Sequence, residues 1–314
     1  SILAVPAIYI ATENAKSYSI CSNISLFVSL LLVILFWYYP DEVSFDKSSS
    51  SYVIYDHFVI NDFSQLFKAI FLLTALAVSV VSSSYFKDDE PHQAEYYVLL
   101  LSSALGMLIT ASASDFLTIF VGIELSAFSS YGLVAFRKKD DKSTEAGAKY
   151  LLIGAFSSAL TLYGISLLYA LTGSVTFEGV NAFLTGLENG VIDGNFNELI
   201  FISSLFITGG LGFKIAVVPF HAWAPDVYEG APAPVTALLA AASKAMGFVA
   251  LLKVFIFTLE PYAEEWKLVF GIIALISMTI GNLAALSQKD IGRMLAYSSI
   301  AQAGYILIAF PALT

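Results

Sequence analysis

Residues 208–220 read TGGLGFKIAVVPF and combine features that conflict in an ordinary transmembrane helix. The stretch lies in the apolar segment 199–220, which is long enough to span a bilayer, yet it carries three glycines, Pro219 and Lys214. Glycine loosens a helix, and proline removes a backbone hydrogen bond. Broken helices at membrane depth are tolerated where they line a cavity or are buried in protein. The stretch therefore predicts a broken transmembrane helix with a lysine beside the break.

The composition places the whole chain in the all-α, polytopic membrane class. Of its 314 residues, 58% are hydrophobic and 13% are charged, whereas soluble domains carry about 25% charged residues. Mean hydropathy is +0.78. The single cysteine, Cys21, excludes a disulfide within the chain, and the three scattered histidines lack metal-ligand spacing. A net charge of −10 argues against nucleic-acid binding. We therefore expect no cofactor, metal or nucleic acid on this chain, and a lipid bilayer around it.

The apolar segments predict a transmembrane bundle of nine spans plus a stub. A spanning helix needs about 20 mostly apolar residues. The segments that meet this requirement are 20–39, 63–86, 96–114, 116–136, 150–171, 199–220, 234–259, 267–286 and 291–310. Residues 1–10 are apolar but too short, and we interpret them as the end of a further helix. The connectors are too short to hold a soluble domain.

The charges of the connectors predict the orientation of the bundle, because basic residues favour the cytoplasmic side. One alternating set of connectors is basic and the other is acidic. The basic set holds Lys16, Lys87, Arg137, Lys138, Lys139, Lys142, Lys289 and Arg293, and the other set holds only Lys47 and Lys267. We place the basic set on the cytoplasmic or matrix side.

Three charges lie deep inside predicted spans. Glu124 is about nine residues from either end of its segment, Lys244 is about as deep, and Lys214 adjoins the predicted break. A charge at the bilayer centre costs about 3 kcal/mol on insertion scales, so such residues usually mark a path for ions or protons. Burial lowers the pKa of a lysine and a nearby carboxylate raises it again. A row of such groups can move protons when conformation changes their spacing. The competing interpretation is that they only join helices.

Four further polar residues can be explained more simply than by a role in a proton path. Lys149 lies near the start of its helix, where its side chain could extend to the surface. Lys253 is nine residues after Lys244, on the opposite side of the helix, and we expect it and Lys68 to extend to the surface. His221 is expected to be a polar residue at the membrane surface, with a direct proton role as the weaker hypothesis.

Four stretches of the sequence are distinctive as whole runs: GFKIAVVPFHAWAPDVYEGAPAPVT at 212–236, GIELS at 122–126, AKYLLIGAFSSA at 148–159, and the region 281–300. These runs resemble the antiporter-like membrane subunits of respiratory complex I, and more narrowly their N type. The resemblance covers roughly 96–310 and is specific, because whole runs match. The N type is favoured by Ala242-Ser243-Lys244.

The resemblance implies roles for matching residues. Glu124 would pair with Lys214 of a broken seventh helix, Lys244 would be the connecting lysine of the eighth, and Lys149 would belong to the same polar axis. The family is built from two inverted five-helix repeats. It implies N-terminal helices over 1–95, the first repeat over 96–259 and the start of a second repeat over 260–314. Because relatives have about fourteen helices, the chain is expected to be incomplete at its C-terminal side.

The resemblance also implies a function: a proton-translocating membrane-arm subunit of an NADH- or related donor:quinone oxidoreductase. Such a subunit holds no redox centre and no electron-donor site, and flavin and iron–sulfur clusters are expected in its partner subunits. Two alternatives stay open, a subunit of a cation/proton antiporter and a structural scaffold. The membrane would be a prokaryotic plasma membrane or a mitochondrial inner membrane.

Overall fold

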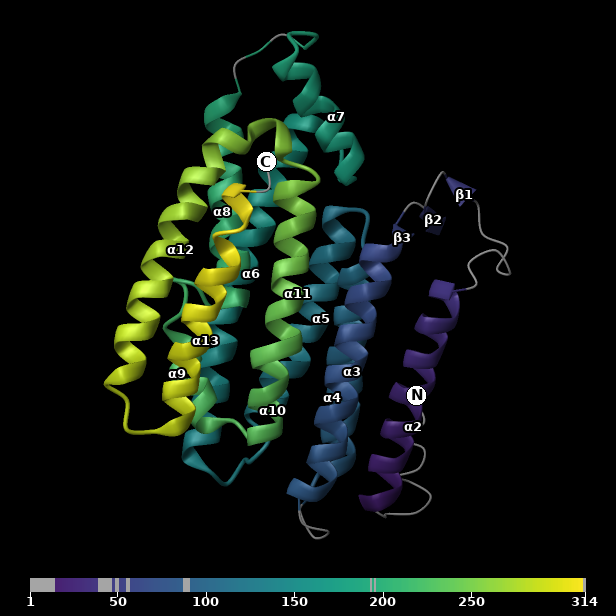
Figure 1. Ribbon diagram of the computed structural model, residues 1–314, viewed down its shortest axis with the longest axis vertical. Helices are drawn as coiled ribbons and strands as arrows, with labels where there is room; N and C mark the ends of the chain where they lie inside the picture. Colours follow the sequence, from purple (N-terminus) through teal and green to yellow (C-terminus); the bar gives the residue numbers. More distant parts are fainter. Residues whose placement is uncertain are drawn as a thin grey trace. The chain divides into compact units, whose positions relative to one another are not determined.

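The computed structural model describes residues 15–38, 47–48, 51–54, 57–86, 91–192, 194 and 196–312 (Figure 1). Within these residues, nine helices are long and apolar enough to cross a membrane, which confirms the predicted number of spans. The apolar stub at 1–10 and the basic connector residue Lys87 lie outside the described residues.

Each membrane-spanning helix overlaps one predicted segment, and the shorter helices over 177–188 and 223–230 were not predicted. The bounds of the helices are α2 Ala15–Tyr38, α3 Asp62–Tyr85, α4 Gln93–Ser112, α5 Phe116–Val134, α6 Asp141–Thr172, α7 Phe177–Glu188, α8 Asn197–Ile215, α9 Trp223–Gly230, α10 Ala233–Leu238, α11 Lys244–Leu251, α12 Ala263–Leu286 and α13 Ile291–Leu307. Two π-helical turns, Leu239–Ser243 and Leu252–Ile256, join α10 and α11 into one span. Short 3-10 turns lie at Glu260–Tyr262 and Phe310–Ala312.

A small antiparallel sheet, which was not predicted, lies in the connector between α2 and α3. Its strands are β1 (Lys47–Ser48), β2 (Ser51–Ile54) and β3 (Phe58–Ile60), in the order β1-β2-β3. An isolated bridge joins Phe58 to Ala113 at the end of α4. The sheet is a local addition to a helical bundle, and the all-α class is unaffected.

The chain forms two compact units, each assembled from separate stretches. The first unit comprises Ser1–Ala113, Val121–Ala148 and Gly230–Met246, and the second comprises Ser114–Phe120, Lys149–Glu229 and Gly247–Thr314. In the first unit, α2, α3 and α4 pack side by side, and α3 also contacts α10. In the second, α12 and α13 form an antiparallel pair (Figure 1), and α12 also contacts α8.

Small residues allow the helices of each unit to approach closely. In the first unit, a Cβ atom placed on Gly122 of α5 would lie 2.9 Å from the Gly106 carbonyl oxygen of α4. In the second, the Ser203 hydroxyl of α8 donates to the Gly164 carbonyl of α6 at 2.7 Å. Large apolar side chains such as Leu152 remain exposed on the outside, as expected for helices that face lipid.

Candidate functional site

The helix break predicted from 208–220 is present, directly after Lys214. Helix α8 ends at Ile215, and Ala216 takes a left-handed conformation with φ of 57°. The Val217 N–H donates back to the Gly212 carbonyl at 3.1 Å, which is the closing bond of a Schellman motif. The chain then passes through a cis Val218–Pro219 bond before α9 begins. The break therefore occupies residues 216–222.

The glycines of this stretch do not loosen the helix, in contrast to the prediction. Helix α8 continues through all of them to Ile215. A Cβ atom on Gly210 would lie 2.8 Å from the Ser157 carbonyl oxygen of α6, and one on Gly212 would lie 2.9 Å from the ring of Phe220. The Ser157 hydroxyl also donates to the Gly210 carbonyl at 2.8 Å. These glycines thus make room for α6 and for the ring of Phe220.

Lys214 lies in the last turn of α8 and is only 4% exposed, so its side chain does not extend to the surface of the chain. Its aliphatic stem passes Gly247 of α11, where an added Cβ atom would lie 3.4 Å from the Lys214 Cγ atom. The absence of a side chain at Gly247 therefore leaves space for this buried lysine.

Glu124 and Lys244 belong to the first unit. Glu124 is half-buried on α5, two residues after the close contact at Gly122. Lys244 is 6% exposed and is the first residue of α11, directly after the π-helical turn Leu239–Ser243. π-helical turns inside α-helices frequently occur at functional sites. Lys214 belongs to the other unit, so its pairing with Glu124 stays a prediction.

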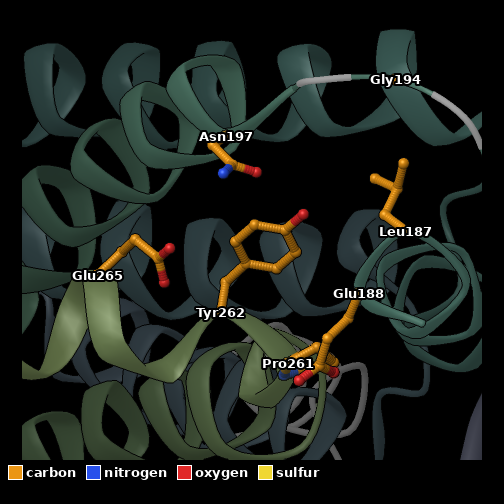
Figure 2. A pocket seen from close by; sticks show the side chains of 7 residues that line it. All are labelled: Leu187, Glu188, Gly194, Asn197, Pro261, Tyr262 and Glu265. Atoms are coloured by element: carbon orange, nitrogen blue, oxygen red, sulfur yellow. The ribbon is translucent and has the colours of Figure 1, made fainter. Parts of the chain in front are cut away.

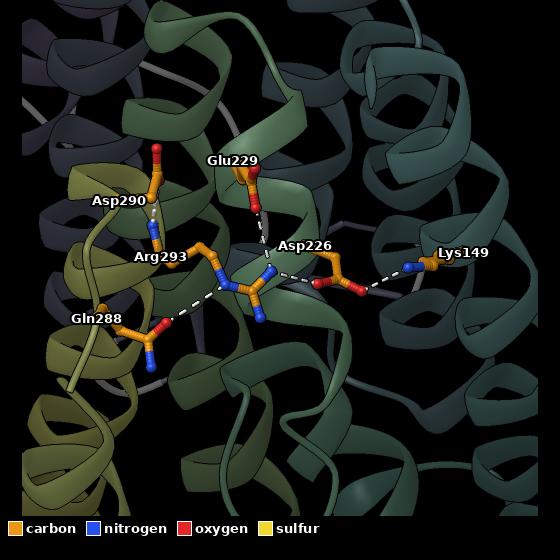
Figure 3. A network of polar contacts seen from close by, with 6 residues as sticks. All are labelled: Lys149, Asp226, Glu229, Gln288, Asp290 and Arg293. Carbon is orange, nitrogen blue, oxygen red and sulfur yellow. Dashed lines mark hydrogen bonds and ion pairs between the residues drawn. The ribbon is translucent and has the colours of Figure 1, made fainter. Parts of the chain in front are cut away.

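Lys149 takes part in a charged cluster of four residues within the second unit (Figure 3). Its Nζ atom donates to Asp226 Oδ2 at 2.6 Å. From the other side, Arg293 Nη1 donates to Asp226 Oδ1 at 2.6 Å and to Glu229 Oε2 at 3.1 Å. The four formal charges cancel. Lys149 therefore has a carboxylate partner in the protein, and its side chain is also 42% exposed, as the interpretation of a surface lysine expects.

Three elements converge to form the charged cluster. Asp226 and Glu229 are three residues apart on α9 and thus share one face. Arg293 is in the first turn of α13, where its backbone N–H is capped by the Asp290 side chain at 2.9 Å. A Cβ atom on Gly292 would lie 2.8 Å from the Tyr228 carbonyl oxygen, so glycine lets the start of α13 approach α9.

Electrostatics keep the central carboxylate ionised. Burial alone would raise the pKa of Asp226, but hydrogen bonds from Lys149 and Arg293 outweigh it and hold the pKa below its ordinary value. The Gln288 amide oxygen accepts from Arg293 Nε at 3.4 Å and completes the polar surroundings of the guanidinium. The cluster is thus organised around an ionised Asp226.

Aromatic contacts anchor the start of α9 one turn before the charged cluster. The Trp223 indole N–H donates to the Phe213 carbonyl at 3.1 Å. The Trp223 ring also stacks on Tyr150, with 4.6 Å between ring centroids. Adjacent residues of α6, Lys149 and Tyr150, therefore both contact α9.

Two other predictions concern single residues: the one for Lys253 is tested by its burial, and the one for His221 stays a prediction. Lys253 was predicted to extend to the surface, but it is 7% exposed inside the π-helical turn Leu252–Ile256. The prediction was wrong because the opposite side of the helix from Lys244 is buried as well. His221 is half-buried within the break, and its carbonyl accepts from the Ala224 N–H at 3.0 Å.

Sequence reasoning missed the partners of Lys149. Arg293 was counted only among the basic connector residues, and Asp226 and Glu229 only as letters of a longer run. The available signal was the spacing of two carboxylates three residues apart on a short helix after a break. It indicates a shared face but does not identify the cations opposite that face.

A second polar feature of this unit is a hollow of about 420 Å³ near the start of α8 (Figure 2). It is lined by Leu187, Glu188, Gly194, Asn197, Pro261, Tyr262 and Glu265. These residues come from the acidic connectors, opposite in predicted orientation to the basic set. Among the residues that the structure describes, no three His, Cys, Asp or Glu side chains gather as metal ligands would.

Comparison with known proteins gives consistent similarities. Residues 113–314 match the family model described as NADH:quinone oxidoreductase/Mrp antiporter, TM. NADH-quinone oxidoreductase subunit N of Desulfitobacterium hafniense is 44% identical over 272 residues, covering 82% of this chain and 53% of the relative. F(420)H(2) dehydrogenase subunit N of Methanosarcina mazei is 43% identical over 255 residues, covering 81% and 50% respectively. The chain thus spans about half the length of the curated relatives it matches.

Solved structures show the same fold. A chain of respiratory complex I from Thermus thermophilus with bound Aureothin has a TM-score of 0.78 and 30% identity, covering 98% of this chain and 62% of that chain. A chain of the Mrp complex from Dietzia sp. DQ12-45-1b has a TM-score of 0.82 at 19% identity, covering 99% and 57% respectively, which shows the fold alone.

Proposed function

Because the chain belongs to the NADH:quinone oxidoreductase/Mrp antiporter transmembrane family, we propose that it forms part of an N-type, proton-translocating membrane subunit of a complex I-type oxidoreductase. The fold supports this proposal, since it is a multi-pass membrane bundle of the antiporter-like type. The observation that carries the proposal is the burial of Lys214 beside a helix break, because a lysine is kept at such depth where it moves or binds charge.

The proposed proton path uses Glu124, Lys149, Lys214 and Lys244. Glu124 acts as the counter-charge of Lys214, as the resemblance implies. When the carboxylate is near, the lysine keeps its proton, and when it moves away the lysine releases the proton to water in the path. Lys244 receives charge next. His221, within the break, is a weaker candidate for a direct role.

The energies of such a mechanism are compatible. Moving one charge against 100 mV costs about 2.3 kcal/mol. One pKa unit corresponds to about 1.36 kcal/mol, so a swing of one to two units matches that cost. No redox centre is needed on this chain, because changes of charge spacing can be driven from neighbouring subunits.

Partners, domains and compartment follow from the same proposal. Other membrane-arm subunits would adjoin this one, and partner subunits would hold flavin and iron–sulfur clusters. Residues 96–259 would form the first five-helix repeat and 260–314 the start of the second. The donor is NADH or another reduced carrier, since relatives are named for NADH and for F(420)H(2). The membrane is a prokaryotic plasma membrane or a mitochondrial inner membrane.

The test measures protons pumped per electron by the whole complex in vesicles. Lys214→Ala and Glu124→Gln should each lower this ratio, while electron transfer in uncoupled vesicles is less affected. A matched control is Lys267→Gln, which removes a lysine paired with Glu264 near the membrane surface. A normal ratio in both Lys214→Ala and Glu124→Gln would refute the proton path and leave the scaffold function.

Purifying the complex separates the oxidoreductase from the antiporter alternative. Copurification with flavin- and iron–sulfur-bearing subunits supports the proposal. A complex that lacks such subunits but exchanges cations for protons would instead support the antiporter function, which the shared fold allows.

A further inference from the structure

The carboxylate of Asp226 is shared between two cations that approach it from different helices. Lys149 of α6 occupies Oδ2 and Arg293 of α13 occupies Oδ1, each at 2.6 Å (Figure 3). Helix α9, which carries Asp226, is only eight residues long. One short helix therefore brings a single anion to two cations at once.

The two cations differ in what they can do. A guanidinium keeps its proton at all physiological pH values, whereas an ammonium can lose one when its surroundings change. Arg293 is also held by Glu229 at 3.1 Å and by Gln288 at 3.4 Å. If Asp226 moves away from Lys149, its charge therefore remains compensated by Arg293. The cluster can lose the Lys149 contact without leaving a carboxylate unpaired.

We propose that Asp226 is the positioning residue of Lys149, and that displacement of α9 sets when the Lys149 ammonium gives up its proton. This inference rests on the proposed function. In the step itself, a proton leaves Lys149 Nζ for a water molecule, the amine becomes neutral, and Asp226 stays ionised beside Arg293. When α9 returns, the ammonium forms again by taking a proton from water.

The way α9 is attached favours this function. It follows the break at 216–222, so it is not part of the continuous hydrogen-bond ladder of α8. Its first residue, Trp223, bonds the Phe213 carbonyl at the end of α8. A change at the Lys214 end of α8 can therefore reach Asp226 through Trp223, one turn away along α9.

The polar groups that contact the cluster include Lys149 from α6, Asp226 and Glu229 from α9, Arg293 from α13, and Gln288 and Asp290 from the turn before α13. Asp290 accepts from the Arg293 backbone N–H and thereby caps α13. Asp226 is the group that joins both cations.

The test is a double-mutant cycle between Lys149→Gln and Asp226→Asn in the whole complex, scored by protons pumped per electron. The expected result is that each single variant lowers the ratio to the same level and that the double variant falls no lower. Assembly is checked by the yield of intact complex. The control Glu264→Gln removes a surface carboxylate–lysine pair and should leave the ratio unchanged.

A normal ratio in assembled Asp226→Asn, or a double variant whose loss is the sum of both singles, would overturn the inference. If Asp226→Asn does not assemble, Lys149→Arg gives the same decision, because arginine keeps the ion pair but cannot release a proton. Lys149→Arg should assemble and lose pumping at least as severely as Lys149→Gln; normal pumping would contradict the inference. Lys214→Ala and Glu124→Gln separate the two proposals: if both variants pump normally, the proton path itself fails.

Discussion

The close contact between α6 and α8 at Gly210 predicts a destabilised Gly210→Ala variant. These two helices carry Lys149 and Lys214. The new Cβ atom would lie 2.8 Å from the Ser157 carbonyl oxygen, which is backbone and cannot rotate away. Overpacking of this kind costs about 1–3 kcal/mol. Separating the helices also weakens the bond from the Ser157 hydroxyl to the Gly210 carbonyl, worth about 0.6 kcal/mol between membrane helices.

Alanine also favours the helix by about 1 kcal/mol over glycine, which offsets part of that cost. The net destabilisation is therefore about 0.5–2.5 kcal/mol. Gly271 of α12 provides a matched control, because nothing lies within 4 Å of its Cβ position. Gly271→Ala should be neutral or slightly stabilising.

The assay is thermal unfolding of the full-length protein in detergent, followed by circular dichroism. The unfolding midpoint should fall for Gly210→Ala and hold or rise for Gly271→Ala. Equal midpoints for the two variants would refute the argument that glycine serves close packing here. An unchanged unfolding midpoint in Gly210→Ala, together with a longer helix α8, would instead support the prediction that these glycines loosen the helix.

Three further predictions concern the break and the charged cluster. Ser277→Ala removes the hydroxyl that accepts from the buried Val218 N–H at 2.9 Å, so the free energy of unfolding should fall by about 1–3 kcal/mol. Ser277→Thr keeps a hydroxyl and should retain most of the stability. A Ser277→Ala variant as stable as the unmodified protein would show that another acceptor takes over. Gly292→Ala brings a Cβ atom within 2.8 Å of the Tyr228 carbonyl oxygen, which should separate α13 from α9 and lower both the unfolding midpoint and the pumping ratio. The folded pKa of Asp226 is depressed, so the contribution of its carboxylate to stability is complete above the ordinary aspartate pKa of about 3.9 and is lost as pH falls through the lower folded value. Asp226→Asn should therefore show a smaller acid-induced fall in the unfolding midpoint. An unchanged acid profile would contradict the ion pairs assigned to Asp226.

Most of the fold could be predicted because hydrophobic length alone identifies a spanning helix. All nine spans were found, although α6 begins at Asp141, nine residues before the predicted segment 150–171, and the break was placed correctly between Lys214 and α9. The small sheet was missed because its strands are too short to show a clear alternation of apolar and polar residues in the sequence.

The candidate site was predicted less completely. Depth in the sequence correctly indicated that Lys214 and Lys244 are buried. The same reasoning failed for Lys253, because depth along a helix does not say whether its other side faces lipid or protein. It also left Lys149 between two interpretations, and its proton role stays a prediction, because the side chain is 42% exposed as well as paired with Asp226.

The order of apolar segments and the charges within them were thus readable from composition and spacing, because the bilayer imposes length and makes isolated charges costly. The partners of those charges were not readable. Lys149, Asp226 and Arg293 are far apart in the chain, and only the packing of α6, α9 and α13 in the second unit brings each of the two cations within 2.6 Å of an Asp226 carboxylate oxygen. Contacts of this kind depend on how the helices are rotated and how closely they approach. A glycine such as Gly292 permits close approach, but its presence in the sequence does not identify which helix approaches it.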